Sequence, residues 1–319
     1  RPAARAAPRR PGVPRAGGGA PGRGGWGVLA AAGGGGGGGA PRGGGAAGPR
    51  PPGPRPPLVA VDLAEAATRL RLPSVEEPLA SAAEMGFALE QGGAPFELVV
   101  SWLGVARQLA AMGVNFCFGP VLDLGGPGSP RGEGECFGES PELVATAGAA
   151  AVDALSAAGL VACGQGFPGR GLGPGAEPAT ADDLEGRDGL PFAAAISHGL
   201  DVIQLATGLY PAWDPKEPAF RSQAVLSDRL RGALGFDGVA VSPDLGIGFG
   251  DAADGAAALR STAEGALAAG CDLLVVGDPE AQGALLDARH PFPGPDVAVR
   301  WREAAQRVTE LRDDWLVPG

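Results

Sequence analysis

Histidine, the commonest general base in enzymes, is scarce in this chain of 319 residues, which contains only two. His198 stands at the end of a predicted helix, just before a predicted strand, and His290 lies in the turn Arg-His-Pro-Phe-Pro. Histidines at helix ends are typically exposed or hydrogen-bonded to the last carbonyl groups of the helix. We therefore expect neither histidine to act as a general base.

Cysteine is also scarce, with four residues that lie far apart, at positions 117, 136, 163 and 271. They form no Cys-x-x-Cys pair, and they have no nearby histidine with the spacing of a zinc site. Three of them lie in or beside apolar, strand-like segments. We expect reduced cysteines in or near the core, no metal site and no cofactor.

A dinucleotide site is formally suggested by residues 164–169 (GQGFPG), which fit the pattern G-x-G-x-x-G after a predicted strand. However, Pro168 has no N–H to donate to a phosphate, and no helix begins at the third glycine. We therefore do not expect a nucleotide to bind there.

Apolar runs of the roughly 20 residues that a membrane helix needs are missing, so we expect no membrane span. The chain does not begin with Met, so a signal peptide could have preceded it. A cytoplasmic location is slightly favoured, and export stays open.

Acidic residues are missing from residues 1–57, which consist almost entirely of Gly, Pro, Ala and Arg. With nine arginines, this segment carries a charge of +9, and the remaining 16 basic and 36 acidic residues give the body −20. Such a composition cannot bury a core and predicts a disordered tail, whose arginines could contact an anionic partner. Only residues 26–32 (WGVLAAA) suggest structure, as the remnant of an early barrel strand.

Residues 58–319 form the second predicted unit, 262 residues long, close to the roughly 250 of one TIM barrel. Within it, predicted helices stop at glycines 113, 159, 199, 235 and 270, and a short apolar strand follows each of them. This repeat of helix, glycine and strand predicts an α/β fold, a (β/α)₈ barrel that is incomplete at its N-terminal strand if one unit is missing.

The most informative unit is residues 226–245 (LSDRLRGALGFDGVAVSPDL). Ser227 is predicted to cap a helix that Gly235 ends, and residues 239–241 form a buried strand. Pro243 and Asp244 follow at the C-terminal end of this strand, where parallel α/β folds place their functional groups.

Residues 226–245 resemble the nucleophile segment of glycoside hydrolase family 3, in the β-N-acetylhexosaminidase type that trims cell-wall (peptidoglycan) sugars. Further similar segments are residues 113–124 (GVNFCFGPVLDL), 135–144 (ECFGESPELV) and 270–276 (GCDLLVV). The resemblance covers nearly all of residues 58–319. It implies a TIM-type barrel and a glycan containing N-acetylglucosamine as the partner.

The same resemblance indicates the site residues. Asp62 matches the aspartate of the family motif Val-Asp-Gln-Glu-Gly-Gly-Arg, which hydrogen-bonds sugar hydroxyls, and Arg69 lies near the arginine of that motif. Gln165 and Arg170 stand where the family has the Lys and the last His of Ala-Lys-His-Phe-Pro-Gly-His-Gly. The substrate-binding candidates are therefore Asp62, Arg69, Gln165 and Arg170.

The catalytic positions differ from the family. Pro243 stands where the family has its nucleophile, which leaves Asp244 as the catalytic candidate, and no histidine stands where the family has its acid/base. Glu135 replaces the arginine that grips the sugar, and Gly166 replaces a substrate-binding histidine.

Three hypotheses follow from these differences. The favoured one is an inactive or impaired scaffold that binds a sugar or a partner at the old cleft. The second is an active retaining β-glycosidase with a shifted site, in which Asp244 is the nucleophile and a loop carboxylate (Glu177, Asp182 or Asp183) is the acid/base. The third is a decayed gene product without a selected site. Because side chains alternate along a strand, Asp244 is predicted to face the helix layer or the backbone of the next loop if Pro243 points inward.

Overall fold

The computed structural model describes residues 26–29, 56–63, 80–126, 131, 134–169, 179–247, 254–286 and 295–316. Its main sheet has seven strands in the order β1-β2-β3-β4-β5-β8-β9. These are β1 (Trp26–Leu29), β2 (Leu58–Asp62), β3 (Phe116–Val121), β4 (Val161–Phe167), β5 (Val202–Leu205), β8 (Val239–Asp244) and β9 (Leu273–Val275). β1 pairs antiparallel with β2, and every other pair in this sheet is parallel. Two further strands, β6 (Leu209–Tyr210) and β7 (Asp214–Pro218), form a separate antiparallel pair.

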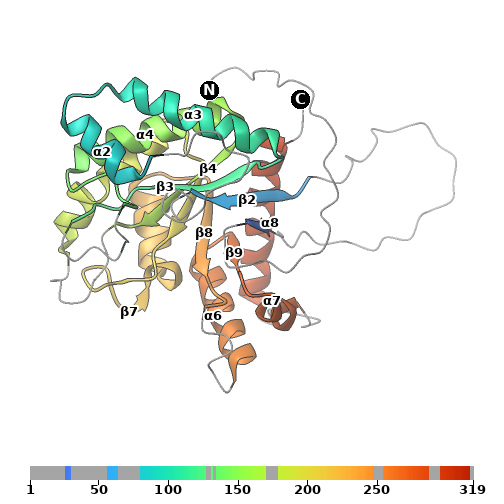
Figure 1. Ribbon diagram of the computed structural model, residues 1–319. Coiled ribbons are helices and arrows are strands. Elements are labelled where there is room, and N and C mark those ends of the chain that lie inside the picture. The colour runs from blue at the N-terminus through green and yellow to red at the C-terminus, as the bar shows by residue number, and fades with distance from the viewer. Residues whose placement is uncertain are drawn as a thin grey trace, which may run out of the picture.

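Helices connect the parallel strands and cover one side of the curled sheet, where α3 and α4 run side by side (Figure 1). The α-helices are α2 (Ala82–Glu90), α3 (Pro95–Ala111), α4 (Pro141–Ala157), α5 (Leu190–Ser197), α6 (Gly255–Ala269), α7 (Pro279–Leu286) and α8 (Pro295–Leu316). Three helical segments are not α-helical: η1 (Asp183–Arg187), η2 (Ala219–Arg221) and η3 (Ala224–Ala233). Among the described helices, none combines the length and the apolar character that a membrane crossing requires.

The helix boundaries follow the local sequence, with one correction. Ser140 caps α4 by accepting a hydrogen bond from the Leu143 N–H at 3.3 Å. Gly235 takes a positive φ of 65° after η3, as predicted. The predicted cap at Ser227 is wrong, because η3 already begins at Ala224. Ser222 instead accepts a hydrogen bond from the Val225 N–H at 3.2 Å, so the cap lies one turn earlier.

Two apolar layers enclose the sheet. On the side of the helices, residues such as Val61, Trp102 and Ala240 belong to a large buried cluster. On the inner side, Val239 and Val241 pack in a second cluster, to which α8 contributes apolar side chains. This alternation fixes which residues at the strand ends point inward.

The predicted α/β fold with a curled, mainly parallel sheet is confirmed, but the complete (β/α)₈ barrel is not formed by the described residues. Their sheet is a half-barrel with β1 and β9 at its edges. Residues 26–29 do form a strand, as their sequence suggested, although this strand is antiparallel to its neighbour. The rest of residues 1–55, with the predicted disorder and anionic partner of the tail, lies outside the described residues.

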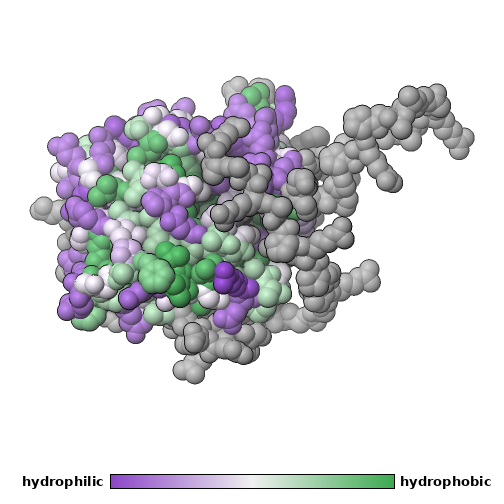
Figure 2. All heavy atoms as spheres, turned by 90° about the horizontal axis from the view of Figure 1, so that it is seen from above, coloured by the Kyte–Doolittle hydropathy of each residue, from purple (hydrophilic) through white to green (hydrophobic). Residues whose placement is uncertain are grey.

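The outer face of the molecule carries several exposed apolar side chains. They include Phe96 and Val100 on α3 and Phe87 on α2. Seen from above, this face shows apolar groups scattered among hydrophilic ones (Figure 2). Polar groups converge instead at the ends of the strands.

Candidate functional site

The C-terminal ends of β2, β3 and β4 bring three polar side chains to one edge of the sheet, which we call the mouth. Asp62 ends β2, Asp123 lies two residues after β3, and Gln165 lies within β4. Parallel pairing places Val121 of β3 beside Gln165. Asp123 and Gln165 are buried, with 2% of each exposed, and Asp62 is half-buried.

A chain of hydrogen bonds joins these side chains. The Gln165 amide donates to Asp62 Oδ1 at 3.3 Å, and Arg131 Nη1 donates to Gln165 Oε1 at 3.3 Å. Arg131 Nε also donates to Asp123 Oδ2 at 2.6 Å in an ion pair. The structure thus brings together the predicted residues Asp62 and Gln165, and it adds Arg131 and Asp123.

The sequence did not predict that Arg131 and Asp123 lie at the mouth. Arg131 lies in a segment of Gly, Pro, Ser and Glu that has no periodicity from which a position could be inferred. Asp123 was recognised only as part of a scaffold motif. A signal was available, because a carboxylate directly after a buried parallel strand lies at the edge where sites form.

Burial dominates the electrostatics of Asp123. Loss of hydration raises the pKa of this carboxyl to about 6, although the neighbouring Arg131 acts in the opposite direction. The negative charges of Asp188 and Glu135 add to the increase. Asp123 Oδ1 is buried and has no hydrogen-bond partner among the described residues. Because Asp123 is only 2% exposed, solvent screens its interaction with Arg131 weakly.

Position 166 explains why Asp123 can occupy the mouth. Gly166 has a φ of 106°, and a Cβ built there would lie 2.2 Å from Asp123 Oδ2. A side chain at this position, where the family has a histidine, would overlap the carboxylate. The glycine therefore provides the space in which Asp123 pairs with Arg131.

A second ion pair, between the partly exposed Arg187 and the buried Asp188, borders the mouth. Arg187 Nε contacts Asp188 Oδ1 at 2.9 Å, and the Asp188 side chain is fully buried. The Tyr210 hydroxyl donates a hydrogen bond to the Gly169 carbonyl at 2.8 Å. Burial raises the pKa of the Tyr210 hydroxyl, and the nearby carboxylates Asp123 and Asp188 raise it further. This hydroxyl therefore stays protonated at neutral pH.

The end of β8 shows where the predicted catalytic residue points. Asp244 Oδ1 accepts hydrogen bonds from the backbone N–H groups of Gly246 and Gly277, both at 2.8 Å. Its carboxylate thus faces the backbone of the loops after β8 and β9. Val239 and Val241 pack on the inner side, and the pairing of β8 with β9 shifts register between Val241 and Asp244, so their alternation does not extend to Pro243. The Asp244 carboxylate nevertheless faces loop backbone, as the sequence predicted.

The remaining candidates are not brought together by the described residues. Arg69, Arg170 and Glu177 lie outside them. Asp183 accepts hydrogen bonds from the backbone N–H and the hydroxyl of Thr180, at 3.1 and 2.9 Å, and these bonds lower the pKa of its carboxyl. A general acid needs a raised pKa, so this environment does not suit proton donation.

His198 and the cysteines occupy structural positions. His198 is the exposed C-cap residue of α5, and its Nδ1 lies 3.1 Å from the Asp153 carboxylate. This confirms the expected surface or capping position, whereas His290 lies outside the described residues. All four cysteines are free and buried, as predicted.

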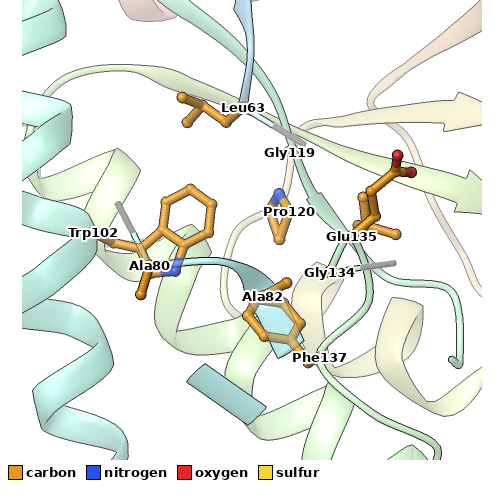
Figure 3. A pocket seen from close by; sticks show the side chains of 10 residues that line it. Leu63, Ala80, Ala82, Trp102, Gly119, Pro120, Gly134, Glu135 and Phe137 are labelled. Atoms are coloured by element: carbon orange, nitrogen blue, oxygen red, sulfur yellow. The ribbon is translucent and has the colours of Figure 1, made fainter. Parts of the chain in front are cut away.

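A small pocket lies beside the mouth, between the segment after β2, α3 and the residues that precede α4 (Figure 3). Its lining includes Leu63, Trp102, Pro120, Glu135 and Phe137, and its volume is about 20 Å³. Trp102 Nε1 is buried and has no hydrogen-bond partner among the described residues. In Figure 3 the indole and Glu135 lie on opposite sides of Pro120.

Comparison with known proteins assigns the chain to a family. Residues 84–288 match the glycosyl hydrolase family 3 N terminal domain, and the chain belongs to this family. A β-hexosaminidase from Methylococcus capsulatus is 37% identical over 272 residues, which cover 76% of this chain and 78% of that protein. A β-hexosaminidase from Chromobacterium violaceum is 35% identical over 219 residues, covering 66% of this chain and 60% of the relative.

Solved structures show the same relationship. A glycoside hydrolase family 3 β-N-acetylglucosaminidase from Paenibacillus sp. aligns with a TM-score of 0.70 and 28% identity, covering 82% of this chain and 51% of that one. A β-N-acetylhexosaminidase from Beutenbergia cavernae aligns with a TM-score of 0.65 and 28% identity, covering 80% and 78%. The chain spans little more than half the length of several curated relatives, for example 54% of a β-hexosaminidase from Stenotrophomonas maltophilia.

Proposed function

We propose that this chain is a β-N-acetylhexosaminidase-like domain that binds a glycan containing N-acetylglucosamine at the mouth and does not hydrolyse it by the family mechanism. The observation that carries the proposal is the end of β8. A proline stands at the nucleophile position, and the next carboxylate, Asp244, is held by two backbone N–H groups of the loops. The names of the relatives, β-hexosaminidase and β-N-acetylglucosaminidase, support the ligand class.

The groups that a retaining glycosidase needs can be compared with those present in this chain. Such an enzyme needs a carboxylate at the anomeric carbon and a second group roughly 5–5.5 Å away that donates and recovers a proton. Pro243 supplies no carboxylate, and the lowered pKa of Asp183 removes one of the candidate proton donors. Hydrolysis at a rate typical of the family is therefore not expected.

Sugar binding needs fewer groups than hydrolysis, and the mouth retains suitable ones. Asp62 and Gln165 offer carboxylate and amide groups that can bond hydroxyls, and Arg131 brings a guanidinium between Asp123 and Gln165. The family's arginine and lysine are replaced by Glu135 and Gln165, so Arg131 is the cation that takes their place at the mouth.

The proposal is tested by ligand-observed NMR with N-acetylglucosamine. We expect saturable, millimolar binding to the full chain and at least a fivefold loss of affinity in Arg131→Met, since a charge-assisted hydrogen bond is lost. Arg107→Met is the matched control, because Arg107 is exposed on α3 and away from the mouth. Absence of binding to the folded wild type, or equal loss in both variants, would contradict sugar binding at this site.

A further inference from the structure

The pairing of β1 fixes where the N-terminal segment of the chain joins the sheet. β1 is antiparallel to β2, and its first residue, Trp26, lies opposite Val61. Since β2 runs toward the mouth and ends there at Asp62, β1 begins at the mouth and runs away from it. Residues 1–25, which precede β1 and lie outside the described part of the chain, are therefore attached beside Asp62.

Chain length keeps one arginine of this segment close to the mouth. Arg23 precedes the first residue of β1 by three positions, a distance of at most about 10 Å, and its long side chain extends the reach to the Asp62 carboxylate. The arginines of residues 30–57 are attached differently. Leu29 and Leu58, which flank that segment, lie opposite each other at the far end of the two strands.

The mouth and residues 1–25 carry opposite charges. The segment has six arginines and no acidic residue. At neutral pH, the described ionisable groups of the mouth and its border are four carboxylates and two guanidinium groups, with a net charge of −2. They are Asp62, Asp123, Glu135, Asp188, Arg131 and Arg187. An arginine that the chain holds beside the mouth is therefore attracted to it.

The described part of the chain also leaves the mouth short of a hydrogen-bond donor. Asp123 is 2% exposed, and its Oδ1 has no hydrogen-bond partner among the described residues. Buried acceptors are normally paired, because an unpaired one loses its hydration without compensation. A guanidinium group provides five N–H donors together with a positive charge. It therefore supplies both of the things that the mouth lacks.

We propose that residues 1–25 are an intramolecular ligand of the mouth, in which guanidinium groups of the segment, that of Arg23 first, pair with the carboxylates Asp62 and Asp123. A sugar then has to displace the segment in order to bind. The contact itself stands on strand pairing, chain length and charge. The competition with sugar rests on the proposed function, because that function assigns Asp62 to sugar hydroxyls.

Limited trypsin digestion of the full chain tests the contact without any sugar. Two matched bonds are available, Arg23–Gly24 beside the mouth and Arg42–Gly43 in the segment attached at the far end. At neutral pH and low salt, Asp62→Asn should raise the ratio of the first cleavage rate to the second by about threefold, since a partly exposed ion pair shifts an equilibrium by up to about fivefold. In the wild type, about 1 M salt should raise the same ratio by screening the charges.

The matched control is Glu310→Gln, which removes one negative charge from an exposed site on α8. Its cleavage ratio should equal that of the wild type. A ratio that stays unchanged in Asp62→Asn, shown to be folded by its thermal transition, or in the wild type at high salt, would overturn the contact. An equal rise in the two variants would also overturn it, because the segment would then follow the overall negative charge of the protein.

The affinity of the full chain for N-acetylglucosamine tests the competition. The double variant Arg15→Gln, Arg23→Gln should bind the sugar about threefold more tightly than the wild type. Arg42→Gln, Arg50→Gln makes an equal change of charge in the other segment and should leave the affinity unchanged. Equal affinities of all three proteins would overturn the competition. If none of them binds the sugar, the proposed function is wrong, and the cleavage ratios still decide whether the contact exists.

Discussion

Gly166 determines what the mouth can contain. The absence of a side chain leaves space for the Asp123 carboxylate, which lies within 2.6 Å of where a Cβ would be. Asp123 in turn positions Arg131, the guanidinium that approaches Gln165. The replacement of the family's histidine at position 166 thus does more than remove a ligand group, because it permits a different polar network.

This dependence can be tested with Gly166→Ala. The added methyl group overlaps Asp123 and also occupies a backbone with a φ of 106°, so we expect a loss of about 2–4 kcal/mol in the free energy of unfolding. Gly186→Ala is the matched control, because a Cβ there meets nothing within 4 Å. Urea denaturation measures both variants. Similar stabilities of the two would show that Asp123 moves aside without cost.

At the scale of the elements, α8 is anchored by ion pairs to a single carboxylate. Its residues Arg300 and Arg307 contact the Asp272 carboxylate at 2.5 and 3.1 Å, and Arg231 contacts it at 2.6 Å. The Asp272 side chain is fully buried and also accepts a hydrogen bond from the Ala240 N–H at 2.9 Å. One carboxylate therefore connects η3, β8 and α8 at the start of β9.

We expect Asp272→Asn to destabilise the protein by about 3–5 kcal/mol, because it leaves three largely buried guanidinium groups without their counter-ion. Glu303→Gln is the control: Glu303 is exposed and lies 3.5 Å from Arg300, and a surface pair contributes about 0–1 kcal/mol. The loss of stability in each variant is measured from its urea denaturation midpoint. A loss in Asp272→Asn no larger than that in Glu303→Gln would mean that α8 is held by its apolar contacts alone.

The position and packing of α8 could be predicted from the sequence only in part. In α8, apolar residues recur at the spacing of one helix face, and Ala304, Val308 and Leu311 of this face are buried, whereas Val299 is 50% exposed. Helical periodicity identifies the apolar face of a helix. It does not show at which residue along the helix this face stops packing against the rest of the protein. The convergence of three arginines on Asp272 was not predictable, because it joins residues up to 76 positions apart.

At the scale of the molecule, glycine stops and apolar runs were enough to predict a curled parallel sheet with helices around it. Closure of the barrel was not predictable, since it depends on pairing between distant edges, and the described sheet ends at β1 and β9. At the mouth, Asp62 and Gln165, the two described motif positions, are hydrogen-bonded to each other, and their binding of substrate stays a prediction. Arg131 was missed because no local pattern positions a side chain in an irregular loop.

We propose that this chain keeps the fold of a glycosidase and has lost the reaction, and the most direct test is the release of nitrophenol from the N-acetylglucosaminide and the glucoside. We predict no turnover above background by the wild type, and only weak turnover by Pro243→Asp, because the acid/base histidine would still be missing. Robust turnover by the wild type that Asp244→Ala abolishes would contradict the account and establish an enzyme with a shifted site.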